Sequence, residues 1–233
     1  MTADEGLTED ARPPAGGRRV LVFVVATVVV LFMGAAIGML IGVAREDAPT
    51  IPGADSVDVG FAQDMRVHHF QAITMAGIER DRTTDPALHS LAFDIESTQL
   101  SQAGEMDGWL TVWEQPELPD IGRAPMSWMG GAGHAHGTTT VGANVTTMPG
   151  MATTEELNKL RGMAPGAEAD IYFLQLMLRH HEGAVPMAQY AAEHASMGYV
   201  RDLAGKMISG QTAEVNLMTQ MLAERGARPL PVN

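Results

Sequence analysis

The chain contains no cysteine among its 233 residues. That absence excludes disulfide bonds, metal sites built on thiolates, and a lipid anchor attached to a cysteine. Aromatic residues are also sparse, with six Phe, three Tyr and three Trp, whereas methionine occurs 17 times. Methionine is therefore the only source of sulfur in this protein, and its abundance requires an explanation.

Basic residues are few, and the formal net charge is −13 at pH 7. Binding to phosphate backbones requires a basic patch, so the composition argues against a nucleic-acid partner. The sequence also lacks the Glu-x-x-His pairs that hold two irons in helical-bundle oxidases. We therefore do not expect an enzyme of that class.

One long uncharged run lies near the N-terminus, from Val20 to Val43. Its 24 residues are enough, at about 1.5 Å per residue, to cross a hydrocarbon core about 30 Å thick. Arg12, Arg18 and Arg19 precede the run, which favours a cytoplasmic N-terminus and an extracytoplasmic domain behind a single pass of the plasma membrane. A cleaved signal peptide is the alternative, but the run is long for one, so we expect a retained anchor.

Three glycines of this run are spaced four residues apart, at Gly34, Gly38 and Gly42. Small residues at that spacing allow membrane helices to approach closely, which favours a homodimer or docking on a larger membrane complex. Glycine is also common in membrane helices in general. The pattern leaves both interpretations open.

The rest of the chain contains an ungapped internal repeat with an offset of 112 residues. The residues that recur unchanged at this offset are Asp58, Phe61, Gln63, Met65, His68, His69, Ala72, Met75, Ala76, Leu91, Ala92, Gln99, Met106 and Leu110. At about 100° per residue, all of them except Gln63 fall on one face of a helix within their own segment. Each copy is therefore predicted to be a hairpin of two helices, each with one apolar stripe.

A single hairpin cannot bury both of its stripes, so the predicted fold is all-α. We expect an antiparallel four-helix bundle formed from the duplicated hairpin, together with the N-terminal transmembrane helix. The helices of the bundle are expected at 58–81, 87–114, 170–195 and 197–225. Pro186 lies inside the third of these and is expected to kink it beside the His pair.

The predicted organisation follows from these elements. In chain order it is a cytoplasmic tail at 1–19, a transmembrane helix at 20–43, a tether at 44–57, the duplicated domain at 58–225 and a C-terminal tail at 226–233. The duplicated domain consists of a first hairpin at 58–114, a linker at 115–169 and a second hairpin at 170–225. The Gly- and Thr-rich linker is not expected to contribute to a core, apart from a short helix at 153–161 that begins with capping-box spacing.

Both copies contain the pattern Met-x-x-His-His-x-x-x-x-x-Met. Its residues are Met65, His68, His69 and Met75 in the first copy and Met177, His180, His181 and Met187 in the second. Thioether and imidazole ligands together select copper(I), or the similar silver ion, over hard cations. Packing alone has no need for two adjacent polar imidazoles at matching positions, so we interpret these eight residues as metal ligands. Zinc, which accepts His and Glu, remains open.

Similar residues occur in looser form elsewhere. They are Met126, Met129, His134 and His136 in the linker, and Glu214 and Met218 in the fourth helix. Methionine fills irregular cores readily, so the stripe of the fourth helix is interpreted first as core packing. The linker is either a metal-capturing loop, in which Trp128 covers a cation with its ring, or a merely flexible connector.

The pattern Asp-x-x-Phe-x-x-x-Met-x-x-His-His-x-x-Ala-x-x-Met-Ala, present in both copies, resembles the family called domain of unknown function 305. The resemblance covers about 57–225 and is closest at 170–188, which Gly150-Met151 precedes. It implies a ferritin-like bundle that is exported or membrane-anchored and, in some members, copper or silver binding and tolerance. The chain departs from the family in its long linker and in lacking a lipid-anchor cysteine.

We therefore expect a membrane-anchored, extracytoplasmic protein that buffers copper(I) or silver, confers tolerance to it or delivers it, without catalysis. The alternative is a non-metal accessory or structural subunit of a membrane complex, in which the histidines serve packing or a partner surface. The metal content of the purified protein would distinguish the two.

Protease added to intact cells with a permeable envelope should remove the duplicated domain and leave a small membrane-bound fragment. The expectation follows from the three arginines before the apolar run and from the length of that run. Immunoblots with tags at each end would follow the two pieces. Protection of the whole chain would show that the orientation is wrong.

Overall fold

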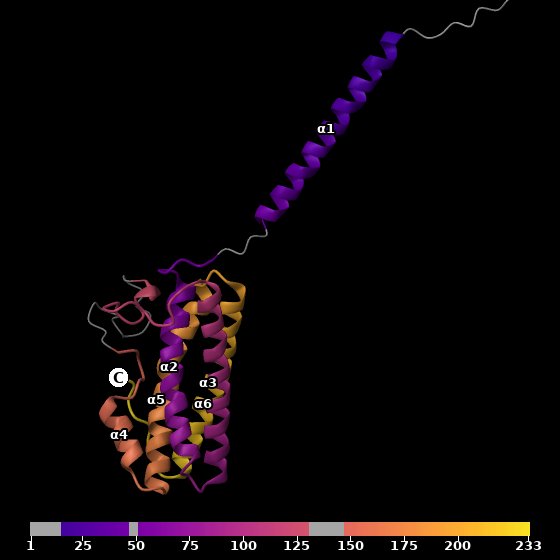
Figure 1. Cartoon of the computed structure of the whole chain (residues 1–233). Helices are drawn as coiled ribbons and strands as arrows, with labels where there is room; N and C mark the ends of the chain where they lie inside the picture. The colour runs from indigo at the N-terminus through magenta and orange to yellow at the C-terminus, as the bar shows by residue number, and fades with distance from the viewer. Residues whose placement is uncertain (1–14, 47–50, 131–146) are drawn as a thin grey trace, which may run out of the picture. The chain divides into compact units, whose positions relative to one another are not determined.

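The computed structural model describes residues 15–46, 51–130 and 147–233. Within these ranges the chain is helical and forms no strand. Its helices are α1 (Ala15–Glu46), α2 (Val57–Arg80), α3 (Pro86–Val112), the short 3₁₀ helix η1 (Ser127–Met129), α4 (Thr154–Gly162), α5 (Ala167–His194) and α6 (Gly198–Glu224), as Figure 1 shows. They belong to two compact units, Met1–Thr50 and Ile51–Asn233.

The first unit contains the apolar helix α1. Its segment Arg19–Met39 has 21 residues and a mean hydropathy of 3.0, and among the described residues it is the one helix that meets the length and composition of a membrane span. A signal sequence near an N-terminus meets the same criteria. α1 begins and ends outside the predicted span of 20–43, so it includes the last residues of the predicted tail and the first of the predicted tether.

The second unit contains the two predicted hairpins. α2 packs along α3, to which residues 81–85 join it, and α5 packs along α6 in the same way. α2 also packs against α5, so the two hairpins meet through these helices (Figure 1). The four helices begin and end within one to three residues of the predicted bounds. α5 remains helical through Pro186, which lies on its exposed side.

Capping residues explain where several helices begin. The side chain of Ser56 caps α2, and Asp85 caps α3 with Pro86 at the first helical position. The predicted capping box of α4 is confirmed, because Thr153 Oγ1 accepts from Glu156 N at 3.1 Å and the Glu156 carboxylate accepts from Thr153 N at 2.8 Å. α6 has no capping side chain of its own.

The cap of α6 comes from the other hairpin. Asp58, which is fully buried in the first turn of α2, accepts from Ser196 N at 3.0 Å and from Met197 N at 2.8 Å, at the start of α6. A carboxylate at a helix N-terminus satisfies free backbone donors and opposes the positive end of the helix dipole. Asp58 therefore ties the first hairpin to the second at this end of the domain.

The repeat also appears in the hydrogen bonds. Gln63 Nε2 donates to Pro116 O and Gln175 Nε2 donates to Arg228 O, each at 2.7 Å. The two bonds are related by the same offset of 112 residues. Each glutamine ties the first helix of a hairpin to the segment that follows the second helix, which explains why Gln63 and Gln175 recur although they lie outside the apolar stripe.

The two ends of the linker pack against the helices. Asp64, which is 2% exposed, accepts from Met126 N at 2.7 Å and from Trp128 Nε1 at 2.8 Å. Trp128 covers Gly60, where a Cβ atom would lie 2.4 Å from the indole side chain. The prediction that the linker contributes nothing to a core is therefore wrong for Met126, Trp128 and Met148, which are all buried. A buried carboxylate with two strong donors orders this part of the chain.

A buried acid lies where the end of α2 meets the start of α5. Glu79 is 3% exposed. Burial, and then the charge and the hydrogen bond of Asp170, raise the pKa of Glu79 from 4.5 to about 8. The folded state therefore binds this proton more tightly than the unfolded state does.

The stability from this proton is complete below about pH 4.5 and is lost as the pH rises towards about 8. Glu79→Gln imitates the protonated acid, so its Tm should approach or exceed that of the wild type as the pH rises through this range. Thermal melts followed by circular dichroism between pH 5 and pH 8 would measure the difference. Glu105→Gln on the exposed side of α3 controls for the loss of one negative charge, and parallel curves for Glu79→Gln and the wild type would contradict the assignment.

Candidate metal centre

The four histidines of the two motifs lie together in the interior, between α2 and α5. His68, His69, His180 and His181 are each at most 1% exposed. The rings of His68 and His180 have their centroids 3.8 Å apart with an interplanar angle of 39°, and those of His180 and His181 are 6.2 Å apart. We call these four residues the histidine layer.

The direction of the helices explains why the two histidine pairs meet. Asp58, at the start of α2, bonds to Ser196 beyond the end of α5, whereas Glu79, at the end of α2, lies beside Asp170 near the start of α5. The two helices therefore run in opposite directions. Equivalent residues of two copies touch only near the axis that relates them, so the contact between His68 and His180 marks the centre of the repeat.

Hydrogen bonds determine which ring nitrogens of the first pair carry a hydrogen. His68 Nε2 lies 3.1 Å from Pro149 O, and a carbonyl only accepts, so this nitrogen donates. His69 Nε2 lies 2.8 Å from Gln102 Oε1 and donates likewise. The Nδ1 atoms of both rings are then lone-pair nitrogens, and both are buried without a hydrogen-bond partner among the described residues.

The second pair differs in its partners. His180 Nε2 is buried without a hydrogen-bond partner in the described part of the chain. His181 Nδ1 donates to Met177 O at 3.0 Å, and its Nε2 lies 2.7 Å from Glu214 Oε2 and 3.5 Å from Gln99 Nε2. Buried polar atoms are nearly always partnered in folded proteins, so three orphan imidazole nitrogens in one layer require an explanation.

Burial keeps three of the four rings of the histidine layer uncharged, those of His68, His69 and His180. It lowers the pKa of His68 to about 4 and that of His69 to about 3, although the hydrogen bonds to Pro149 and Gln102 oppose the shift. Burial also lowers the pKa of His180 far below its usual value, and the neighbouring histidines add to the effect. At neutral pH these imidazoles are neutral, the state in which imidazole binds metals.

The methionines of the two motifs are exchanged between the copies. Met65 and Met187 belong to one apolar cluster, and Met75 and Met177 belong to another. All four are fully buried. Each cluster thus combines one methionine from each copy. Because α2 and α5 run in opposite directions, the methionine before the histidine pair in one copy lies on the same side of the layer as the methionine after the pair in the other copy. The motif of one copy alone therefore does not gather its two sulfurs at one place.

The other predicted ligands are spread along the domain. Met126 is buried and Met129 partly buried in the cluster of Met65, whereas Met218 is buried in the cluster of Met75. Glu214 contacts His181, as described above. His134 and His136 lie outside the described residues. Trp128, which in one of the two interpretations of the linker covers a cation, packs its ring on Gly60, Phe61 and Tyr190.

Carboxylates and imidazoles alone do not form a complete metal site here. Over residues 15–46, 51–130 and 147–233, no group of three or more His, Asp or Glu side chains is arranged to hold an ion. A metal in the histidine layer would therefore need thioether or amide donors as well. The donor set that the interior offers consists of neutral imidazole nitrogens and methionine sulfurs, which fit a soft monovalent ion.

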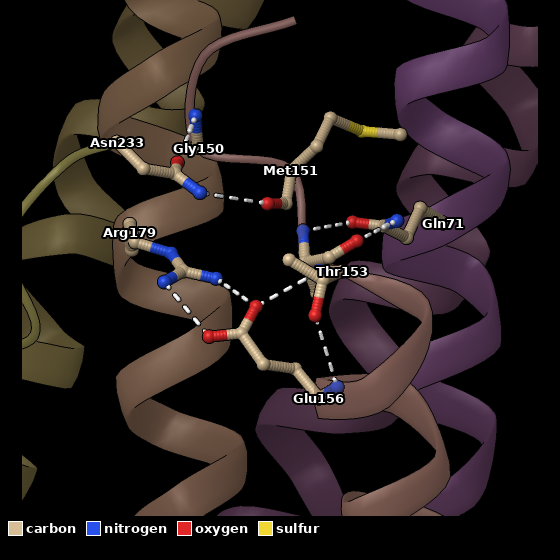
Figure 2. A network of polar contacts seen from close by, with 8 residues as sticks. Gln71, Gly150, Met151, Thr153, Glu156, Arg179 and Asn233 are labelled. Atoms are coloured by element: carbon tan, nitrogen blue, oxygen red, sulfur yellow. Dashed lines mark hydrogen bonds and ion pairs between the residues drawn. The ribbon is translucent and has the colours of Figure 1, made fainter. Parts of the chain in front are cut away.

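Residues 148–153 form a strap that contacts α2, α5 and, through Pro149, His68 of the histidine layer. Figure 2 shows its residues Gly150, Met151 and Thr153 between α2 and α5. Gln71 bonds to Ala152 through both of its side-chain ends, at 2.6 and 2.8 Å. Asn233 accepts from Gly150 N at 3.1 Å and donates to Met151 O at 3.3 Å. The strap also supplies the Pro149 carbonyl that orients His68.

An ion pair and two glycines hold the strap close to α5. Arg179 binds both oxygens of Glu156, at 2.6 and 3.0 Å, directly after the strap (Figure 2). A Cβ atom on Gly183 would lie 2.2 Å from Pro149 O, and one on Gly150 would lie 2.4 Å from Arg179 O. Only glycine allows this approach, and Gly150 also has a positive φ of 76°.

Sequence reasoning missed the residues that hold the strap. Gln71 and Gly183 occupy equivalent positions of the two copies, and both contact the strap, one by a hydrogen bond and the other by close approach. The repeat is broken at this position, with an amide in one copy and a glycine in the other. The difference between Gln71 and Gly183 was the available signal in the sequence, but the strap could not be identified as their shared contact without the structure.

Comparisons with known proteins give one family and several similar structures. The family model described as "Domain of unknown function (DUF305)" matches residues 58–222. No curated protein matches the chain. A DUF305 protein of Streptomyces coelicolor, described as secreted, is 43% identical, with a TM-score of 0.67, and the match covers 77% of this chain and 99% of that one.

Two further structures are similar. A DUF305 fragment of Deinococcus radiodurans is 29% identical, with a TM-score of 0.56, over 72% of this chain and 96% of that one. CopM in a Cu(II)-bound form is 25% identical, with a TM-score of 0.51, over 72% of this chain and 97% of that one.

Gly183→Ala should destabilise the domain although alanine favours helices, because the added Cβ would meet the backbone of Pro149. Overpacking of this kind typically costs about 1–3 kcal/mol. Gly205→Ala on α6 is the matched control, since nothing lies within 4 Å of its Cβ position, and it should stabilise by about 0.5–1 kcal/mol. Thermal melts would compare the two variants, and a Gly183→Ala protein as stable as Gly205→Ala would show that the strap is not held against α5.

Proposed function

Since the chain belongs to the DUF305 family, we propose that it is a membrane-anchored, extracytoplasmic protein that binds copper(I) or silver(I) for buffering, tolerance or delivery. The observation that carries the proposal is the histidine layer, which presents three buried imidazole nitrogens without hydrogen-bond partners in the described residues. Each such buried group costs about 1–3 kcal/mol when it is left unpaired. A bound ion would offset that cost.

The chemistry of the interior supports a soft ion. The imidazoles of His68, His69 and His180 are neutral, the sulfurs on the same two helices are thioethers, and the chain has no cysteine that could serve instead. Thioethers do not oxidise to disulfides, which suits an extracytoplasmic compartment. Copper(I) and silver(I) accept few ligands and prefer sulfur and imidazole, whereas zinc would need harder donors.

The likeness to CopM adds support, since that protein is described in a Cu(II)-bound form. We assign the principal ligands to the eight motif residues named above and secondary contacts to Met126, Met129, His134, His136, Glu214 and Met218.

The finer architecture of the domain is also part of the proposal. We take α2, α3, α5 and α6 as a ferritin-like antiparallel four-helix bundle with pseudo-twofold symmetry, because the bonds of Gln63 and Gln175 are repeated at the offset of the sequence.

The cellular location follows from α1. We propose that α1 is retained as an anchor with its N-terminus in the cytoplasm, because arginines precede the apolar run. The DUF305 protein of Streptomyces coelicolor described as secreted supports an exported domain. Gly34 and Gly38 are exposed along α1, and with Gly42 they would provide the close-packing face of a homodimer or of docking on a larger membrane complex.

The alternative is an accessory subunit without a metal, in which the histidine layer serves only packing and fold specificity. One observation favours it, namely that three of the four imidazoles already have a hydrogen bond to a defined partner. A purified protein that never retains or binds a soft metal would support this alternative.

The full chain should bind copper(I) in anaerobic competition with a chromophoric chelator. His68→Ala/His69→Ala and His180→Ala/His181→Ala should each weaken binding by more than about 10-fold, since even the loss of a residue that only supports a ligand costs about 10- to 100-fold. Gln63→Ala/Gln175→Ala is the matched control, because it removes side-chain hydrogen bonds to Pro116 O, Leu118 O and Arg228 O that do not involve the layer. Circular dichroism would establish that each variant is folded, and His68→Gln would keep a polar side chain if alanine prevents folding.

A folded variant without the four histidines that binds copper(I) as tightly as the wild type would leave the accessory subunit as the better account.

A further inference from the structure

The second histidine of each pair has a chemically different partner in the two copies. His69 bonds to Gln102 at 2.8 Å, and His181 contacts Glu214 at 2.7 Å. The two contacts are related by the 112-residue offset, so they are the same contact in the two copies. One copy has a neutral amide where the other has a carboxylate.

The contact of His181 with Glu214 requires a hydrogen or a metal ion between the two groups. His181 Nδ1 donates to the Met177 carbonyl at 3.0 Å, so in the neutral ring Nε2 has a lone pair and no hydrogen. That lone pair points to a carboxylate oxygen at 2.7 Å, which can only accept when ionised. Two acceptors at this distance repel each other unless a proton or a metal ion lies between them.

A second oxygen donor is available at the same place. Gln99 is 2% exposed, and its side-chain nitrogen lies 3.5 Å from His181 Nε2. Its Oε1 is buried without a hydrogen-bond partner in the described residues. Rotation of the amide by half a turn would direct this oxygen to the space beside His181. Nitrogen, carboxylate and amide oxygen together are donors for a harder cation than copper(I).

The charges of the two halves lead to different ions. A divalent ion beside Glu214 leaves a net charge of +1, whereas beside Gln102 it would leave +2 in an interior where charge is costly. A monovalent soft ion on the lone pair of His69 Nδ1, in the half that contains Gln102, leaves +1. The carboxylate therefore offsets the extra charge of a divalent ion in one half only. The Glu214 side chain is also 22% exposed, which gives an ion a route from solvent.

We propose that Glu214 sets the ion specificity of the second copy, so that His181, Glu214 and Gln99 hold a divalent cation of the Zn(II) or Cu(II) class. The half around His69 and Gln102 takes only a monovalent soft ion. This inference rests on the proposed function, because it assumes that the histidine layer binds metals. It adds that the duplicated halves have diverged into two sites with different preferences.

The test uses the full chain in detergent with Zn(II) and Ag(I), two ions that do not change oxidation state during the measurement. Glu214→Gln should lower the ratio of Zn(II) to Ag(I) affinity by more than about 10-fold, since even the loss of a residue that only supports a ligand costs about 10- to 100-fold. Gln102→Glu should add a second equivalent of bound Zn(II). Competition with a chromophoric indicator would give affinities, and elemental analysis would give the number of ions bound.

Glu105→Gln, an exposed substitution of the same kind on the same helix as Gln102, should leave both affinities unchanged. Equal losses of Zn(II) and Ag(I) in Glu214→Gln, or no loss of Zn(II), would overturn the inference. A wild type that binds Ag(I) but no Zn(II) would overturn this inference and leave the proposed function standing. A wild type that binds neither ion would overturn both.

Discussion

Four imidazoles lie at the centre of the helices, where they must find hydrogen-bond partners without water. Burial lowers the pKa of His68, His69 and His180, so these three rings enter the interior as neutral groups. A neutral imidazole still has one donor and one acceptor to satisfy. Much of the surrounding structure, from the Pro149 carbonyl to the Gln102 amide, is arranged to meet the donors. Acceptor nitrogens such as Nδ1 of His68 and of His69 have no hydrogen-bond donor among the described residues, and this imbalance is the basis of the proposed metal binding.

The strap at 148–153 shows how one loop can complete a duplicated domain. This single loop contacts the same position of the repeat in both copies, once on α2 and once on α5, and it makes a different contact with each. The copies must therefore differ there, and they do so at Gln71, which bonds to the strap, and at Gly183, which makes room for it. Equivalent residues that are identical also have different partners, since Asp58 caps α6 whereas Asp170 lies beside Glu79. Duplication provided the frame, and single substitutions then adapted each half to its neighbours.

The distinction between Gln102 and Glu214 extends this divergence to the chemistry of the site. An amide and a carboxylate have nearly the same shape, so the exchange leaves the packing of the helices unchanged while it alters the charge beside a buried imidazole. In an interior of low dielectric constant, one such charge decides which ion is tolerated.

The sequence by itself determined the helices, because a period of 3.6 residues and a gapless repeat are local properties that survive without knowledge of contacts. It also identified the apolar N-terminal helix, the capping box of α4 and the histidines as the chemically distinctive residues. Only the tertiary structure decided that the two histidine pairs meet, since this depends on the opposite directions of α2 and α5. The same packing decided which methionine of one copy shares an apolar cluster with which methionine of the other, Met65 with Met187 and Met75 with Met177. The burial of Trp128 and Met126 was likewise decided by a distant partner, Asp64. Contacts between residues far apart in the chain depend on how whole helices pack, and no local pattern carries that information.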